Sequence, residues 1–223
     1  MCGRFVLLTD LKTIVEAFRI QEVACEYAPH HNISPGREVA AVIHDVRNRL
    51  VGFRWGLIPS WARDPAIGNR MFNARAETLA EKPSFREAFR KRRCLIVADG
   101  FYEWPKTARV KQPLRFSLLS GEPFGLAGLY ETWIPREGTP VRTCTIITTK
   151  PNSLLQPVHD RMPVIVPKEG ESAWIDPDNR RWTELLSMLK PYEAEKMAMS
   201  RVDPESLRTA PDPLPALAAP RPS

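Results

Sequence analysis

The chain has 223 residues, enough for one full-sized domain, and its 43% hydrophobic and 26% charged residues exclude a wholly disordered chain, a collagen and a coiled coil. The 32 Lys and Arg residues outnumber the 26 Asp and Glu residues, and the formal charge of +6 suits a polyanionic partner without requiring one. The 22 prolines exclude a helical bundle, because each fixes φ and removes a backbone donor, and they indicate many loops and short strands.

In the first part of the chain, the sequence predicts one helix and two strands. Apolar residues recur at helical spacing over residues 11–18, and Thr9 or Asp10 can serve as the N-cap. Residues 39–43 and 50–55 are short apolar runs, and residues typical of turns lie between them, so strands are expected there.

In the remainder of the chain, strands outnumber helices. A second helix is expected to begin at Pro83, a favoured first-turn residue, and a third helix spans residues 182–189, whose apolar side chains share one face. Further short strands, most of them bounded by Gly or Pro, are expected at residues 94–98, 114–119, 124–130, 141–149 and 162–166.

The order of these elements predicts the fold class. About seven strands with few helices and no regular β-α alternation indicate an α+β domain, a single domain built on a mainly antiparallel, barrel-like sheet flanked by a few helices. This domain is expected to span residues 1–202. Residues 203–223 contain six prolines and few large apolar groups, so we expect a disordered, proline-rich tail.

Cysteine spacing and hydropathy indicate a cytoplasmic protein with reduced thiols. Cys2, Cys25, Cys94 and Cys144 form no C-x-x-C pair, so zinc and iron–sulfur sites are not expected, and no metal or other cofactor is predicted. A signal-peptide core is missing, which also makes a disulfide scaffold unexpected. No apolar run of about eighteen residues could span a bilayer, so no membrane partner is predicted.

Cys2 is the most unusual residue by position. A small residue after the initiator Met normally allows that Met to be removed, which would leave Cys2 with a free α-amine beside its thiol. An α-amine has a pKa of roughly 7.7–8.0, so a useful neutral fraction exists near pH 7. The alternative is that position 2 is simply a small residue. The tight, charged start Gly3-Arg4-Phe5 favours the first interpretation.

Two features could bind nucleic acid. Residues 53–61 hold Trp55 and Trp61 with Arg, Gly and Pro in a predicted loop, and bases stack on aromatic faces at about 1–3 kcal/mol each. The alternative is a pair of core tryptophans, which is the better interpretation for Trp55 and equally good for Trp61. The basic run over residues 86–93 could follow a phosphate backbone or be only a solvated helix face.

Polar residues in three further motifs could carry chemistry. Asn73 and Arg75 could orient a substrate and clamp a phosphate, although a role in a cap or turn is the alternative. Glu103 lies between aromatic residues at a strand end, where desolvation raises the pKa of a carboxyl and suits it to proton transfer. The alternative is a solvated Glu on a hairpin. His159, beside an Asp and an Arg, is the best general acid–base candidate among the four histidines.

Seven short motifs follow one another along the chain. They are Met1-Cys2-Gly3-Arg4-Phe5, Asn32-Ile33-Ser34-Pro35-Gly36, Trp55-Gly56-Leu57-Ile58-Pro59-Ser60-Trp61, Asn73-Ala74-Arg75-Ala76-Glu77-Thr78, Asp99-Gly100-Phe101-Tyr102-Glu103-Trp104, Ala127-Gly128-Leu129-Tyr130-Glu131 and His159-Asp160-Arg161-Met162-Pro163. In this order and spacing they together strongly resemble the SOS response-associated peptidase (SRAP) family of abasic-site processing proteins. The resemblance covers residues 1–202.

The resemblance implies an abasic-site sensor of the DNA damage response. Such a protein binds single-stranded DNA in a basic groove and joins its N-terminal cysteine to the lesion, shielding it. By this resemblance, a monomer associated with the nucleoid is expected. The catalytic residues would be Cys2, Asn73 for positioning, Glu103 as acid and base, and His159. The DNA-binding residues would be Arg4, Pro35, Trp61, Arg75 and Arg161.

The chemistry of these groups predicts a thiazolidine crosslink. The Cys2 amine would attack the ring-opened abasic sugar, and the thiol would then close a five-membered ring, helped by proximity. If the thiol were slow, the imine could lose its β-phosphate, which is an abasic-site lyase reaction. Two alternatives remain: a thiol peptidase, perhaps acting on its own N-terminus through Cys2 and His159, and a non-covalent single-stranded DNA-binding protein.

Overall fold

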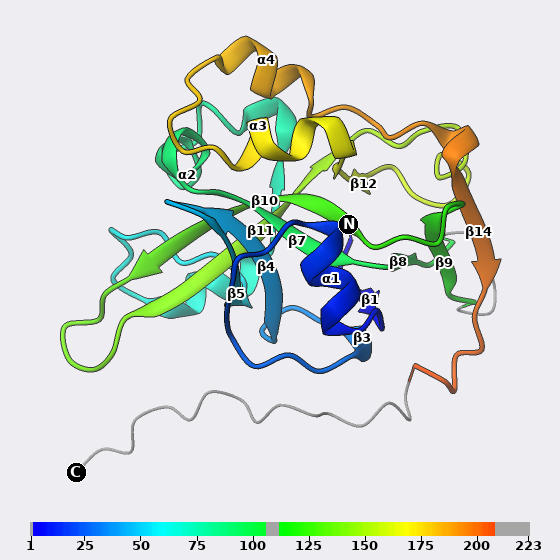
Figure 1. Cartoon of the computed structure of the whole chain (residues 1–223), viewed down its shortest axis with the longest axis horizontal. Helices are drawn as coiled ribbons and strands as arrows, with labels where there is room; N and C mark the ends of the chain where they lie inside the picture. Colours follow the sequence, from blue (N-terminus) through cyan, green and yellow to red (C-terminus); the bar gives the residue numbers. More distant parts are fainter. Residues whose placement is uncertain (1, 106–111, 208–223) are drawn as a thin grey trace.

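A closed barrel of five strands forms the centre of the fold, as Figure 1 shows. The computed structural model describes residues 2–105 and 112–207 of the chain. Around the barrel, the strand order is β5 (Asn48–Trp55), β4 (Glu38–His44), β7 (Arg93–Ala98), β10 (Phe124–Trp133) and β11 (Val141–Thr149). Neighbouring strands are antiparallel except at the closure, where β11 pairs in parallel with β5.

A second, antiparallel sheet adjoins the barrel. Its order is β14 (Met197–Arg201), β9 (Leu114–Leu118), β8 (Gly100–Glu103), β1 (Phe5–Leu7) and β3 (His30–Ile33). Only Asp99 separates β7 from β8, so the chain passes directly from the barrel into this sheet. The Asp99 carboxylate accepts hydrogen bonds from the amides of Leu8 at 2.5 Å and Thr9 at 2.9 Å, which fixes the end of β1 beside the start of β8.

The helices of the described residues are short. Helices α2 (Arg86–Lys91), α3 (Glu171–Ile175) and α4 (Trp182–Ser187) gather at one end of the molecule, while α1 (Leu11–Ala17) lies apart from them (Figure 1). No helix in the described part of the chain is long and apolar enough to cross a membrane. The remaining short elements are β2 (Glu22–Ala24), β6 (Asn73–Arg75), β12 (Met162–Pro163), β13 (Ile165–Val166) and the 3-10 helices η1 (Pro65–Arg70), η2 (Ala76–Thr78), η3 (Lys168–Gly170) and η4 (Ala194–Lys196).

The predicted fold class is confirmed, and so are most of the predicted elements. Helix α1 is capped by Asp10, whose carboxylate accepts the amide of Thr13 at 3.0 Å. Helix α2 begins at Arg86, three residues after the predicted start at Pro83. The sequence pattern missed several strands and one α-helix of three to five residues, which are too short to display a clear period: β1, β2, β3, β6, β8, β14 and α3.

The motif around Trp55 is divided between the core and the surface. The Trp55 side chain is buried, and its indole Nε1 donates to the carbonyl of Phe72 at 2.7 Å, which confirms the core interpretation. Gly56 has a φ of +137°, and a Cβ there would lie 2.6 Å from the carbonyl oxygen of Gly68, so the turn accepts only glycine. Beyond this turn Trp61 is 59% exposed.

Arg93, at the end of the basic run, is a structural residue. Its side chain is 2% exposed, so the interpretation of the whole run as a phosphate-binding surface is wrong at this position. Burial lowers the pKa of the guanidinium, and a buried arginine needs hydrogen-bond partners. Its partners are the backbone carbonyls of Phe89, Arg90, Trp174, Asp176 and Asn179, which ties α2 to the segment that contains α3.

Candidate active site

The pairing of β1 with β8 brings the start of the chain to Glu103. The register places Phe5 opposite Phe101, and the amide of Tyr102 donates to the carbonyl of Arg4 at 2.9 Å. Because the strands are antiparallel, the residues before Arg4 approach the last residue of β8, which is Glu103. Cys2 and Glu103 are both buried, at 0% and 4% exposure, so the Glu103 carboxyl is not a solvated hairpin residue.

Asn73 joins this pair from the barrel side. Strand β6, which carries Asn73, pairs in parallel with the barrel strand β11. The Asn73 side-chain amide donates to the carbonyl oxygen of Cys2 at 2.8 Å. Its Oδ1 atom is buried and has no hydrogen-bond partner within the described residues. Because a buried amide oxygen without a partner is costly, this atom is suited to accept a hydrogen bond from a bound amine or hydroxyl group.

The surroundings of the Cys2 thiol keep it protonated. Burial raises the pKa of this thiol well above its ordinary range, and the negative charge of Glu103 raises it further. The thiolate is the nucleophilic form of cysteine, and it is formed readily only where neighbouring groups lower the pKa. The thiol of Cys2 is therefore a poor initial nucleophile at neutral pH.

His159 lies in the loop between β11 and β12, with its side chain 12% exposed. Its ring Nδ1 accepts the backbone amide of Arg161 at 3.0 Å, and the carboxylate of Asp160 is also 3.0 Å from Nδ1. Only a ring protonated on Nδ1 could bond to Asp160, and such a ring could not accept the amide. The backbone donor is fixed whereas Asp160 is 69% exposed, so we assign the proton of the neutral ring to Nε2.

Arg161 connects the His159 loop to the strand of Asn73. Its guanidinium forms a two-pronged ion pair with Glu77, at 2.7 and 2.9 Å, and also donates to the carbonyl of Thr148 at 2.5 Å. Glu77 lies in η2, directly after β6. The structure thus joins Cys2 to Asn73 through a hydrogen bond and places the charge of Glu103 close enough to act on the Cys2 thiol. It attaches the His159 loop to the segment of Asn73 through Arg161.

The other predicted DNA-binding residues differ in exposure. Arg75 and Trp61 are exposed, and Pro35 is half-buried between β3 and β4. Arg4 donates to the side-chain oxygen of Asn32 at 3.2 Å. A cleft of about 440 Å³ is lined by Arg4, Asn32 and Glu103, and this volume is within the range of small-molecule sites.

Sequence reasoning assigned no role to two residues of this region. Asn32 holds Arg4 through its oxygen and donates through its nitrogen to the carbonyl of Leu207 at 2.7 Å. Glu77 pairs with Arg161, 84 residues away along the chain. Both residues lie in the motifs that carry the resemblance, but the spacing gave no signal of these partners.

Residues just after the predicted domain boundary also line the cleft. Pro204 and Leu207 form part of its wall, and the amide of Val202 donates to the carbonyl of Pro113 at 3.1 Å. The first residues of the predicted tail therefore contact the folded domain. The rest of that tail, residues 208–223, lies outside the described residues.

Comparisons with known proteins show the family and the fold. Residues 1–206 match the family described as SOS response associated peptidase (SRAP). The chain is 48% identical over 206 residues to the abasic site processing protein YoqW of Bacillus subtilis, covering 91% of this chain and 92% of the relative. It is 46% identical to YoaM of the same organism, with 91% of each chain covered. A crystal structure of a protein from Bacteroides thetaiotaomicron superposes with a TM-score of 0.87 at 29% identity, covering 95% of this chain and 97% of that one.

Proposed function

This chain belongs to the SRAP family, and we propose that it processes abasic sites in single-stranded DNA by bonding to them covalently through Cys2. The observation that carries the proposal is the contact of Cys2 with Asn73 and the charge interaction of its thiol with Glu103, which lines a neighbouring cleft together with Gly3 and Arg4. Relatives at 46–48% identity are named abasic site processing proteins, which supports the choice of lesion. We expect the protein to act as a monomer.

The first nucleophile is the α-amine of Cys2, exposed by removal of Met1. The raised pKa of the Cys2 thiol supports this order, because the thiol is protonated near pH 7 whereas an α-amine is partly neutral there. The amine nitrogen bonds to the aldehyde carbon of the ring-opened deoxyribose. The carbonyl oxygen then leaves as water, and an imine remains.

The thiol completes the crosslink. Its sulfur bonds to the imine carbon while its proton passes to the nitrogen, which closes a five-membered thiazolidine. One water is lost overall, and no oxidant or reductant is required. Because amine and thiol belong to one residue, ring closure has the advantage of an intramolecular reaction.

Glu103 and His159 supply the proton transfers. The buried carboxylate of Glu103 takes a proton from the Cys2 ammonium before attack and returns one when water leaves. His159, with its proton on Nε2, speeds opening of the closed sugar: the C–O ring bond breaks as the ring oxygen takes the Nε2 proton, and the proton released by the hemiacetal hydroxyl returns to Nε2, which leaves the open aldehyde and a neutral imidazole. Asn73 holds the Cys2 carbonyl and orients the residue for both steps.

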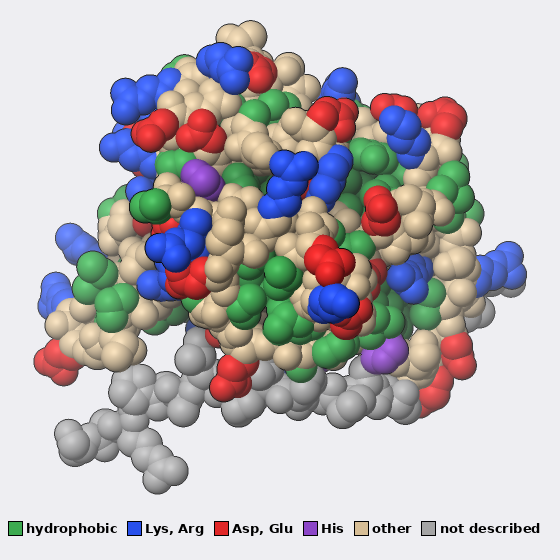
Figure 2. Space-filling model, viewed as in Figure 1, with side chains coloured by type: hydrophobic (Ala, Val, Ile, Leu, Met, Phe, Trp, Pro, Cys, Tyr) green, Lys and Arg blue, Asp and Glu red, His purple; other side chains and the backbone are tan. Residues whose placement is uncertain are grey.

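The DNA strand should be held by charge and stacking around this cleft. Figure 2 shows basic and acidic side chains interspersed over the visible face, so the charge of +6 alone does not place the strand. Arg75 extends from the strand that carries Asn73, and the exposed ring of Trp61 offers a stacking surface for an unpaired base. We infer that the strand passes these two residues.

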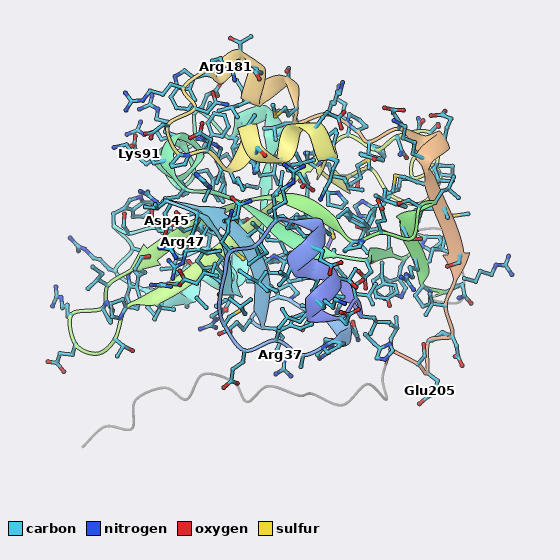
Figure 3. The ribbon with its side chains drawn as sticks, viewed as in Figure 1. Arg37, Asp45, Arg47, Lys91, Arg181 and Glu205 are labelled. Atoms are coloured by element: carbon cyan, nitrogen blue, oxygen red, sulfur yellow. The ribbon has the colours of Figure 1, made fainter. Side chains whose placement is uncertain are left out.

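Binding to single-stranded DNA should therefore weaken steeply with salt, and Arg75→Ala should lower the slope of log K against log salt concentration by about 1. Fluorescence anisotropy at several salt concentrations measures this slope. The matched control is Arg181→Ala, because Arg181 is an exposed residue at the N-cap of α4. Figure 3 places it at the top of the view, far from Glu205, which in the sequence follows Pro204 of the cleft wall. An equal slope for the Arg75→Ala and wild-type proteins would show that the DNA strand does not pass Arg75.

The two alternative functions make different demands on Cys2. A thiol peptidase needs a thiolate paired with an imidazole, and the raised pKa of the Cys2 thiol opposes that state. A non-covalent DNA-binding protein needs no reactive group, so it requires neither the Asn73 contact with Cys2 nor the charge interaction of Cys2 with Glu103. Lyase activity remains compatible with the proposal, as a side reaction of the imine.

A denaturing gel separates these functions. The protein is incubated with a single-stranded oligonucleotide that carries one abasic site, and with the same oligonucleotide carrying an ordinary base. The proposal predicts a slowly migrating protein–DNA band with the abasic oligonucleotide only. Retention of both oligonucleotides on a native gel with no shifted band on the denaturing gel would support the non-covalent function instead.

A further inference from the structure

We propose that Glu77 is a positioning residue for the crosslinking reaction: through Arg161, it fixes the ring of His159 beside the strand that carries Asn73. This inference rests on the proposed function, in which His159 opens the abasic sugar.

The first step is the geometry of the ion pair. Both terminal nitrogens of Arg161 contact Glu77, one carboxylate oxygen each, at 2.7 and 2.9 Å. Such a pairing fixes the plane of the guanidinium as well as its position. A further bond to the carbonyl of Thr148 attaches the same guanidinium to the end of barrel strand β11. The Arg161 side chain is consequently held from two directions and is only 14% exposed.

The second step connects this pair to the histidine. The backbone amide of Arg161 donates to Nδ1 of His159, so the position of Arg161 selects the tautomer and the orientation of the ring. Glu77 follows Asn73 by four residues, in the turn that continues β6. The ion pair therefore sets the distance between the element that orients Cys2 and the element that carries the imidazole.

The third step concerns charge. The hydrogen bond from Arg161 lowers the pKa of the Glu77 carboxyl, so the carboxylate stays ionised at neutral pH and neutralises the guanidinium. The Nε atom of Arg161 is buried without a hydrogen-bond partner in the described residues. A guanidinium that is neutralised and largely covered is well placed to hold a loop.

The test compares four single variants and one double variant by the rate of adduct formation on an abasic oligonucleotide. Glu77→Gln keeps the shape and removes the charge, and Arg161→Lys keeps the charge and removes the fork. His159→Ala and the double variant Glu77→Gln/His159→Ala complete a cycle. The matched control is Glu87→Gln, because Glu87 forms an exposed ion pair with Arg90 on α2.

We expect Glu77→Gln and Arg161→Lys each to slow the reaction about 10- to 100-fold, in the range found when a supporting contact is lost. In Glu77→Gln, the affinity for an oligonucleotide without the lesion, and the salt slope of that affinity, should stay unchanged. The double variant should be no slower than His159→Ala, and an oligonucleotide that carries an open-chain aliphatic aldehyde should relieve the slowing. A general loss of structure would reproduce neither result.

Three outcomes would overturn the inference. In the first, Glu77→Gln forms the adduct as fast as Glu87→Gln. In the second, the slowing by Glu77→Gln and the slowing by His159→Ala multiply in the double variant. In the third, Arg161→Lys reacts like the wild type, which would show that Arg161 acts through its charge alone. Melting temperatures show whether each variant is folded at the assay temperature. If Glu77→Gln is unfolded at that temperature, the reaction rate of Arg161→Lys decides whether the inference holds. No adduct with the wild-type protein would instead overturn the proposed function, and this inference with it.

Discussion

Replacing Cys2 with serine should turn a stable crosslink into a labile one. The amine is still present in Cys2→Ser, so the imine forms, but a hydroxyl adds to it far less readily than a thiol does. The heat-stable adduct should fall by about a hundredfold, because the intramolecular ring closure that protects it is lost. Borohydride should trap the imine, and strand cleavage should exceed that of the wild type.

A matched control for this variant is Cys25→Ser. Cys25 is a half-buried free thiol that belongs to none of the site motifs and does not line the cleft, so its substitution should leave adduct formation unchanged. Denaturing gels run with and without heating, and with and without borohydride, measure the heat-stable adduct, the trapped imine and the cleaved strand. A Cys2→Ser protein that forms a heat-stable adduct at the wild-type rate would show that no thiazolidine is made.

Replacing Glu103 with glutamine should slow the reaction without weakening DNA binding. The amide keeps the shape of the side chain but cannot take the proton from the Cys2 ammonium. General acid–base groups typically contribute about 10²- to 10⁴-fold, and we expect a loss of that size in the rate of adduct formation. Single-turnover kinetics on an abasic oligonucleotide measure the rate, and anisotropy measures the affinity.

The same variant has an independent signature at the thiol. The Glu103 charge is one cause of the raised pKa of Cys2, so Glu103→Gln should let the thiol ionise at lower pH, although burial still opposes ionisation. The pH dependence of thiol alkylation measures this shift. Glu171→Gln is the matched control, because Glu171 is another buried glutamate and burial also raises the pKa of its carboxyl. Equal rates in the Glu103→Gln and Glu171→Gln proteins would remove Glu103 from the mechanism.

The sequence pattern predicted the barrel but not its closure. Alternation and turn residues report only on contacts nearby in the chain, and they located each of the five barrel strands to within a few residues. Closure depends on the parallel pairing of β11 with β5, in which Thr143 lies beside Arg54. No local pattern signals which distant strand will pair with which, because the pairing is decided by packing of the whole barrel.

The sequence predicted the chemically active residues of the candidate site but not the ion pair that supports them. Cys2, Glu103 and Asn73 could be chosen from residue type and from the family motifs, and the fold brings them together. Glu77 and Arg161 are 84 positions apart in the sequence and belong to two different polar motifs, so residue type alone could not reveal that they form an ion pair. The two tryptophans of one motif differ for a similar reason, since the turn at Gly56 buries one and exposes the other.

The most direct measurement is the mass of the crosslinked product. The account predicts a mass equal to the protein without Met1 plus the abasic oligonucleotide minus one water, with the DNA attached to the peptide that begins at Cys2. Borohydride should leave this mass unchanged, because a thiazolidine has no carbon–nitrogen double bond to reduce. Retention of Met1 in the product, attachment at a lysine, or addition of two hydrogens by borohydride would contradict the account.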